Sequence, residues 1–167
     1  MSTRKRTHPS QAPVSTGESG ASPRLLIRPL KAVDLDEVIS IDAEATGIEK
    51  IEYWHELFRH YRSHRQQRFF LVAEVGGIAG GFVLGEVRDW EFGAPPCGWV
   101  FGMGVRRDLR LGGIGGALFG AMIECFRGVG VEKVHTITGR DNNLMLSFFR
   151  SQGMMAAPVI PLELDLR

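Results

Sequence analysis

The chain has 167 residues, of which 44% are hydrophobic and 23% charged, and a formal net charge of +1 at pH 7. This composition is typical of a single globular domain, and so small a net charge predicts neither a nucleic-acid nor a membrane partner. The two cysteines, Cys97 and Cys125, fit neither a metal site nor a disulfide framework, so we expect no metal. No segment approaches the roughly 20 apolar residues of a membrane span, and the basic start has no apolar stretch behind it, which favours the cytoplasm.

Apolar periodicity and turn residues predict the elements in chain order. Residues 1–23 are rich in Ser, Thr, Pro, Gly and basic side chains, which predicts a disordered tail before one domain over 24–167. Within the domain we expect strands at 24–30, 69–75, 78–87, 99–105, 131–138 and 159–166, and helices at 35–45, 51–64, from 114 onward, and at 142–151. Asp34 is placed to cap the first helix. The order is that of an α/β fold with a mixed sheet.

A glycine-rich loop joins the strand at 99–105 to the helix that begins at 114. It carries the pattern R-x-x-G-x-G over residues 110–115. Glycines before a helix let a ligand approach the backbone, and the free N–H groups of the helix start attract anions, so we expect a diphosphate there. The loop lacks the Lys and Ser/Thr of a Walker motif, and its glycines do not fit the dinucleotide fingerprint.

Two motifs resemble those of the GNAT N-acetyltransferase family. Residues 105–115 are similar to its central motif, a strand ending in Val, a basic turn, Q/R-x-x-G-x-G/A and a helix. Residues 142–154 resemble its downstream motif, N-x-x-A-x-x-L-Y-x-K-x-G-F. The resemblance covers roughly residues 24–167. It implies a mostly antiparallel mixed sheet, splayed at the cofactor site and flanked by helices. It also implies transfer of an acetyl group from acetyl-CoA to a primary amine, such as a protein N-terminus, a lysine or a small amine.

The same resemblance implies which residues contact the coenzyme. They are Met103, Gly104, Val105, Arg110, Leu111, Gly112, Gly113, Ile114, Gly115, Asn142 and Phe149. The glycine loop would bind the diphosphate, the end of the strand would offer backbone groups to the pantetheine arm and the acetyl carbonyl, and Asn142 would contact the arm.

The catalytic groups depart from the family pattern. Phe149 stands where the family usually has a Tyr that protonates the departing sulfur, and a phenyl ring has no proton to donate. The thiolate then leaves without a protein acid, or another group such as Ser147 or a bound water supplies the proton, or the chain is a non-catalytic acyl-CoA-binding module. Glu86 and Glu91 are the candidates for the general base, and His135 is either a further candidate or an ordinary sheet histidine.

The family commonly ends with two strands after its second motif, whereas thirteen residues follow Met154 here. We therefore expect a single, shortened terminal strand in which Leu162, Leu164 and Leu166 face one way. An apolar strand at a free sheet edge invites pairing with another chain, which predicts a homodimer.

Overall fold

The computed structural model describes residues 24–63, 67–89 and 93–167. The expected tail at 1–23, the base candidate Glu91 and residue 64, the expected end of the second helix, lie outside these residues. The described elements are β1 (Leu25–Pro29), α1 (Leu35–Thr46), α2 (Ile51–Ser63), β2 (Arg68–Val75), β3 (Ile78–Arg88), β4 (Cys97–Val105), α3 (Ile114–Gly128), β5 (Val134–His135) and α4 (Asn143–Ser151). Their order up to α4 is the predicted one, and the α/β class with a mixed sheet is confirmed.

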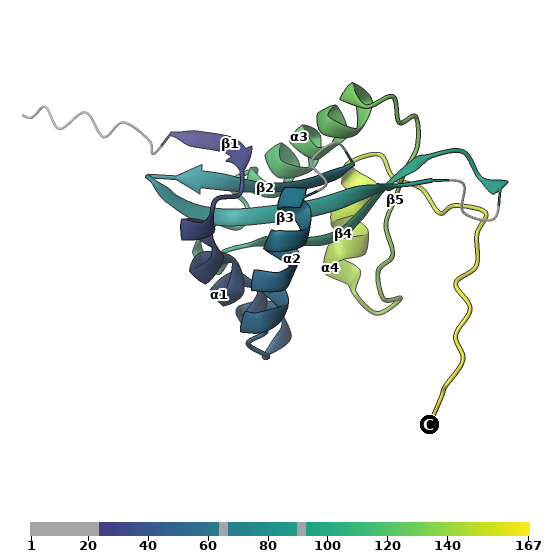
Figure 1. Ribbon diagram of the computed structural model, residues 1–167, viewed down its shortest axis with the longest axis horizontal. Coiled ribbons are helices and arrows are strands. Elements are labelled where there is room, and N and C mark those ends of the chain that lie inside the picture. Colours follow the sequence, from purple (N-terminus) through teal and green to yellow (C-terminus); the bar gives the residue numbers. More distant parts are fainter. Residues whose placement is uncertain (1–23, 64–66, 90–92) are drawn as a thin grey trace, which may run out of the picture.

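One sheet, with strands in the order β1-β2-β3-β4-β5, forms the centre of the described structure (Figure 1). Neighbouring strands are antiparallel except for β4 and β5, which are parallel. Gly76 and Gly77, both with positive φ, make the tight turn between β2 and β3. β5 is much shorter than the expected strand at 131–138, since only Val134 and His135 pair with β4.

The sheet separates two apolar cores. Helices α1 and α2 lie on one face and α3 on the other, as Figure 1 shows. Phe70 and Val72 of β2 belong to the core under α1 and α2, whereas Leu71 and Ala73 between them belong to the core under α3. This alternation follows from the two-residue period of a strand. Each of β2 and β3 therefore contributes side chains to both cores.

Asp34 ties the first strand to the first helix in a way that differs from the expected cap. Its carboxylate accepts hydrogen bonds from the Arg28 guanidinium at 2.7 and 2.8 Å and from the Lys31 backbone N–H at 2.8 Å, and it makes no cap bond to α1. A 3₁₀ turn over Ala32–Asp34 precedes the helix and directs the side chain backward to Lys31. The Arg28 hydrogen bonds hold the pKa of Asp34 below its usual value.

The predicted terminal strand is wrong. Residues 155–167 form no strand and run away from the body of the molecule (Figure 1). Pro158 and Pro161 lack the N–H that a ladder needs and restrict the residues before them, which disfavours pairing within the monomer. Leu162, Leu164 and Leu166 are each at least 80% exposed as a result.

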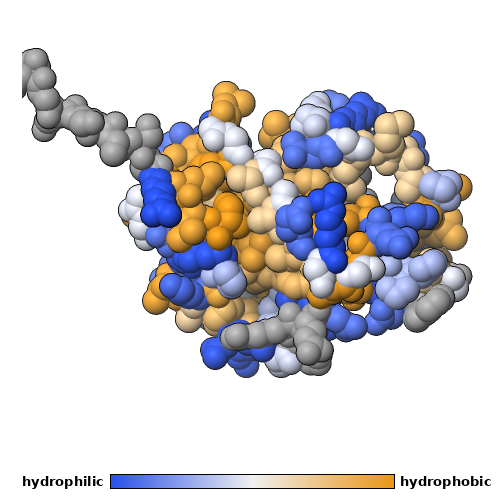
Figure 2. All heavy atoms as spheres, turned by 90° about the horizontal axis from the view of Figure 1, so that it is seen from above, coloured by the Kyte–Doolittle hydropathy of each residue, from blue (hydrophilic) through white to orange (hydrophobic). Residues whose placement is uncertain are grey.

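Further apolar side chains are exposed at the far end of the sheet, over β1 and the β2–β3 turn. Leu25, Leu26 and Ile78 are 40–50% exposed there, and Figure 2 shows the corresponding hydrophobic area beside the start of the described chain.

No helix among the described residues is long and apolar enough to cross a membrane.

Candidate functional site

The loop before α3 adopts the backbone conformation that an anion site needs. Leu111 and Gly113 both have positive φ, 71° and 76°, and Leu111 is fully exposed. Leu111 is the single non-glycine residue with positive φ in the described part of the chain, a conformation that costs energy and is concentrated at functional sites. Such alternation of left-handed and ordinary residues turns successive N–H groups toward one side.

The N-terminus of α3 has no cap from its own side chains. Gly113 occupies the N-cap position, and the helix has no acidic residue in its first turn. The first N–H groups of a helix have no partner within it, so those at the start of α3 point out of the helix toward the loop. Free N–H groups and the positive end of a helix dipole are together the features that attract anions.

Glycine is required at different positions of the motif for different structural reasons. A Cβ on Gly113 would meet nothing within 4 Å, so its requirement is the positive φ. A Cβ on Gly115 would lie 3.2 Å from the Phe148 ring, so this glycine lets α4 pack against α3. Gly113 is therefore explained by the backbone conformation of the loop, and Gly115 by helix packing.

The outer edge of β4 is open beside this loop. β5 pairs only with Gly98 and Trp99, and no described strand pairs with that edge from Val100 to Val105. At the point where the pairing ends, β4 carries a bulge: Leu84 lies opposite Gly102 and Gly85 opposite Val100, which leaves Phe101 as the extra residue. The sheet is thus splayed between β4 and β5, as the resemblance implied.

The ladder between β3 and β4 decides which backbone groups reach the open edge. The Arg106 N–H donates to the Gly80 carbonyl at 2.9 Å, and antiparallel ladders alternate, so Gly104 and Gly102 bond to β3. The backbone groups of Met103 and Val105 therefore point to the open edge. Gly104 serves packing, because a Cβ there would lie 2.8 Å from Ile41 of α1.

Arg110 and Asn142 are the two polar side chains that the resemblance implies as coenzyme contacts. The Arg110 Nε donates to the Val105 carbonyl at 3.1 Å, which fixes the arginine against the end of β4 with its side chain exposed. Asn142 is the N-cap of α4 and accepts a hydrogen bond from the Met145 N–H at 3.1 Å. Its side-chain oxygen is therefore used for capping, and its amide NH₂ is the group that can serve a ligand.

Phe149 lies in the core rather than on the surface. It is 6% exposed and its ring packs edge-on against Phe119 of α3 and Phe148 of α4, with centroid distances of 5.7 and 5.2 Å. The position that carries a hydroxyl in the family pattern is filled here by a purely apolar contact. Ser147, another residue considered as an acid, is exposed on α4.

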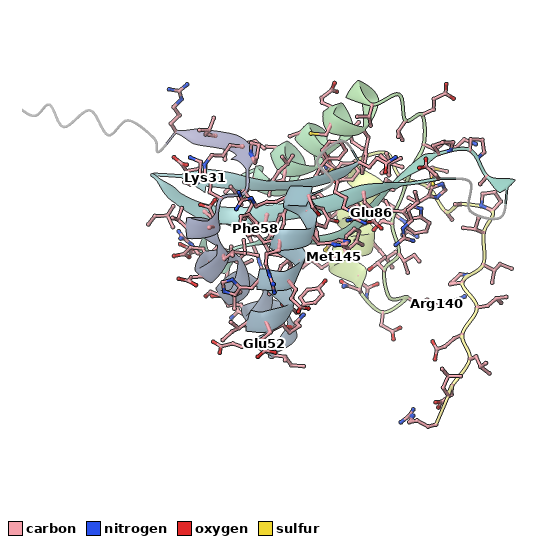
Figure 3. The ribbon with its side chains drawn as sticks, in the orientation of Figure 1. Lys31, Glu52, Phe58, Glu86, Arg140 and Met145 are labelled. Carbon is pink, nitrogen blue, oxygen red and sulfur yellow. The ribbon has the colours of Figure 1, made fainter. Side chains whose placement is uncertain are left out.

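Glu86 lies on β3 beside α2 (Figure 3) and is surrounded by basic and aromatic side chains. Its Oε1 accepts from the Arg88 Nε at 3.1 Å, and its Oε2 lies 3.4 Å from the Arg68 Nε. The Arg88 guanidinium stacks over Trp99, whose other neighbour is the stacked ring of His135. We call Arg68, Glu86, Arg88, Trp99 and His135 the Glu86 cluster.

Sequence reasoning singled out Glu86 and His135 but not the other members of this cluster. Arg68 and Arg88 stand at strand positions where the alternation of side chains predicts a direction toward a core. This alternation is the signal that could have identified them. Their meeting with Trp99 depends on strand register, which the pattern does not give. In the described part of the chain, no three His, Cys, Asp or Glu side chains come together as a metal site would require.

The profile of the acetyltransferase (GNAT) family matches residues 35–154, which include the glycine loop, the open edge of β4 and α4. The chain belongs to the GNAT family.

Solved structures agree with the GNAT fold. The aminoglycoside N-acetyltransferase AAC(6')-Iy in complex with CoA superposes with a TM-score of 0.77 at 14% identity, over 89% of this chain and 99% of that one. Glucosamine-6-phosphate N-acetyltransferase from Arabidopsis thaliana gives 0.68 at 17% identity, over 86% and 99%. A transcriptional regulator from Bacillus halodurans C-125 gives 0.72 at 18% identity, over 86% and 100%. Comparison with curated protein sequences finds no match.

Proposed function

We propose that this GNAT protein is an acetyl-CoA-dependent N-acetyltransferase that acts on a primary amine in a ternary complex. The observation that carries the proposal is the uncapped start of α3 beside the open edge of β4. The first attracts a diphosphate and the second offers backbone groups to an extended arm, and together they fit coenzyme A. The loop 110–115, Met103, Val105 and the Asn142 amide would hold it.

The reaction needs few protein groups. The amine nitrogen attacks the thioester carbonyl carbon, the new C–N bond forms, the C–S bond breaks, and sulfur takes the electron pair as a thiolate. A thiol pKa of about 8.5 makes departure without a protein acid feasible, which fits the phenyl ring at 149. The protein must hold the two reactants in line, and backbone N–H groups at the open edge would stabilise the developing oxyanion.

A proton must also leave the ammonium group of the acceptor. We propose Glu86 as the base among the described residues, acting through water, because it lies next to β4 on the face where α2 packs. Both of its oxygens already face guanidinium groups, which donate hydrogen bonds and cannot accept a proton, so the Glu86 carboxylate itself would take the proton and pass it to water. Glu91, the other candidate, lies outside the described residues.

Binding and turnover are tested separately. Calorimetric titration should show CoA binding in preference to ATP and NAD, and release of free thiol from acetyl-CoA should depend on an added amine. A panel of a peptide N-terminus, a lysine peptide, amino sugars and small amines then defines the acceptor. Preference for ATP or NAD would refute the coenzyme assignment.

Phe149 favours a second candidate, a non-catalytic acyl-CoA-binding or regulatory module that retains the cradle and lacks the acid. The same titrations separate the two. CoA binding with no thiol release above background, across the whole panel of amines, would support the module and exclude the enzyme.

We also propose a homodimer in which the apolar residues 162–166, which follow the two prolines, pair with the sheet of a second copy. The support is the unpaired apolar segment together with the short edge strand β5. Leu162→Glu with Leu164→Glu should give a monomer in sedimentation, whereas Glu163→Gln, on the opposite side of the segment, should leave the mass unchanged. A monomeric unmodified chain would refute the dimer.

The cytoplasm stays the predicted compartment, on composition alone.

A further inference from the structure

Four polar or aromatic side chains of the Glu86 cluster form one row across the sheet. Arg68 of β2 lies opposite Glu86 of β3, Glu86 opposite Trp99 of β4, and Trp99 beside His135 of β5. Residues paired in this way project from the same face. That face is the one covered by α2, because a Cβ on Gly85 or Gly98, the residues next to Glu86 and Trp99, would meet Phe126 of α3 on the other side.

The row lies at the point where the splay between β4 and β5 begins. Trp99 is the last residue of β4 that pairs with β5, and the edge of β4 is open from there to the glycine loop. If the diphosphate binds at the loop, an arm that follows this edge brings its far end, which bears the acetyl group, toward the row. The row is therefore at the reacting end of the proposed coenzyme site.

Among the described residues, two buried hydrogen-bond donors at this row have no hydrogen-bond partner. They are the Tyr61 hydroxyl and the Trp99 indole N–H. Tyr61, from α2, is 5% exposed and packs against Phe101, the bulge residue of β4. An indole N–H can only donate, and the hydroxyl stays protonated because burial raises the pKa of Tyr61.

Unpartnered buried donors call for an acceptor, and native proteins rarely leave them unmatched. The neighbouring Arg68 and Arg88 guanidiniums, which also only donate, compensate the charge of Glu86. An oxygen that enters between these groups is stabilised most when it is negatively charged, since hydrogen bonds to ionised groups are the stronger ones. A polycationic acceptor would meet two donors and two arginines against the single carboxylate of Glu86.

We propose that the Glu86 cluster, with Tyr61, is a subsite for a negatively charged group, a carboxylate or a phosphate, carried by the acceptor amine. The inference rests on the proposed N-acetyltransferase function and narrows its substrate class. It separates this chain from enzymes that acetylate polycationic aminoglycosides.

Matched acceptors test the charge preference. Glucosamine 6-phosphate against glucosamine isolates a phosphate, glycine against glycinamide isolates a carboxylate, and sisomicin supplies a polycation. Binding to the protein–CoA complex is measured by calorimetry and turnover by thiol release. We expect at least one anionic member to bind about tenfold or more tightly than its neutral partner. Equal or weaker binding of both anionic members, or preference for sisomicin, would overturn the subsite.

Three ring substitutions test the residues. Tyr61→Phe and Trp99→Phe each remove one unpartnered donor, so each should weaken binding of the anionic acceptor by about ten- to about a hundredfold. Tyr61→Phe should not lower Tm, whereas Trp99→Phe also trims the ring on which Arg88 and His135 stack and should lower it. Trp54→Phe is the control, because its indole N–H donates to Asp42 at 2.9 Å. It should lower Tm and leave acceptor binding unchanged. Unaltered acceptor affinity in both Tyr61→Phe and Trp99→Phe would contradict the proposal.

These outcomes are distinct from failure of the proposed function. Transfer to neutral or cationic amines as fast as to anionic ones would refute the anion subsite and leave the proposed N-acetyltransferase function standing. Absence of transfer to every amine would refute the N-acetyltransferase function. The acceptor titrations, which need no turnover, would still decide whether the cluster binds anions.

Discussion

Gly113→Asp is the sharpest test of the diphosphate cradle, with Gly113→Asn as its matched control. Gly113 has a φ of 76° and open space around its missing Cβ. Asn and Asp tolerate this conformation better than other residues and have nearly the same size, so the two variants differ by one negative charge.

The size of the effect follows from Coulomb's law. A carboxylate about 5 Å from a diphosphate with two negative charges is opposed by about 2–7 kcal/mol, for dielectric constants from that of water to that of a protein surface. Screening at physiological salt, with a Debye length of about 8 Å, roughly halves this. We therefore expect Gly113→Asp to bind CoA roughly five- to four-hundredfold more weakly than Gly113→Asn.

The folded state should respond in the opposite direction. A carboxylate at a helix N-terminus is stabilising by about 0.3–1 kcal/mol, so Gly113→Asp should be at least as stable as Gly113→Asn. Calorimetric titration with CoA at two salt concentrations measures the affinities, and thermal unfolding measures the stabilities. Equal CoA affinity of the two variants at low salt would refute the cradle at the start of α3.

Three further changes probe the acid position, the base and the link between β1 and α1. Phe149→Tyr buries a hydroxyl in an apolar contact, which should lower the free energy of unfolding by about 1–3 kcal/mol. It should change kcat by less than about threefold, and a tenfold rise in kcat would show that sulfur protonation limits the rate. Glu86→Gln should lower kcat by about a hundredfold at neutral pH, and the deficit should shrink as pH rises and the acceptor becomes a free amine; a deficit independent of pH would indicate a positioning role. Asp34 has a pKa below its unfolded value, so its contribution is present above about pH 4 and is lost as pH falls through the folded pKa. Asp34→Asn should therefore lose about 2–4 kcal/mol in denaturant unfolding at pH 7 and much less near pH 2, and an equal loss at both would contradict this account.

The local parts of the candidate site follow from the sequence. Residues 110–115 and the helix after them are contiguous, and glycine has a direct conformational meaning at Gly113. Phe149 is likewise visible as a departure from the family pattern. The fold up to α4 follows from apolar periodicity, because each helix and strand buries one face against the sheet.

Other parts depend on register and partners, which a single sequence does not give. The outward direction of Met103 and Val105 comes from the ladder with β3. The meeting of Arg68, Glu86 and Trp99 comes from pairing between strands far apart in the chain. The terminal strand was expected from alternating leucines at 162, 164 and 166, yet alternation shows only that a segment suits pairing, not that a partner is available.

The division of the molecule into two cores by a single sheet has an evolutionary consequence. Within the described residues, the core under α1 and α2 and the core under α3 share no side chain. Free-energy changes at separated sites with no common partner are usually additive. Mutations on the α2 face are therefore expected to leave the proposed coenzyme cradle at the start of α3 intact, so that the proposed acceptor side can change without loss of the coenzyme side.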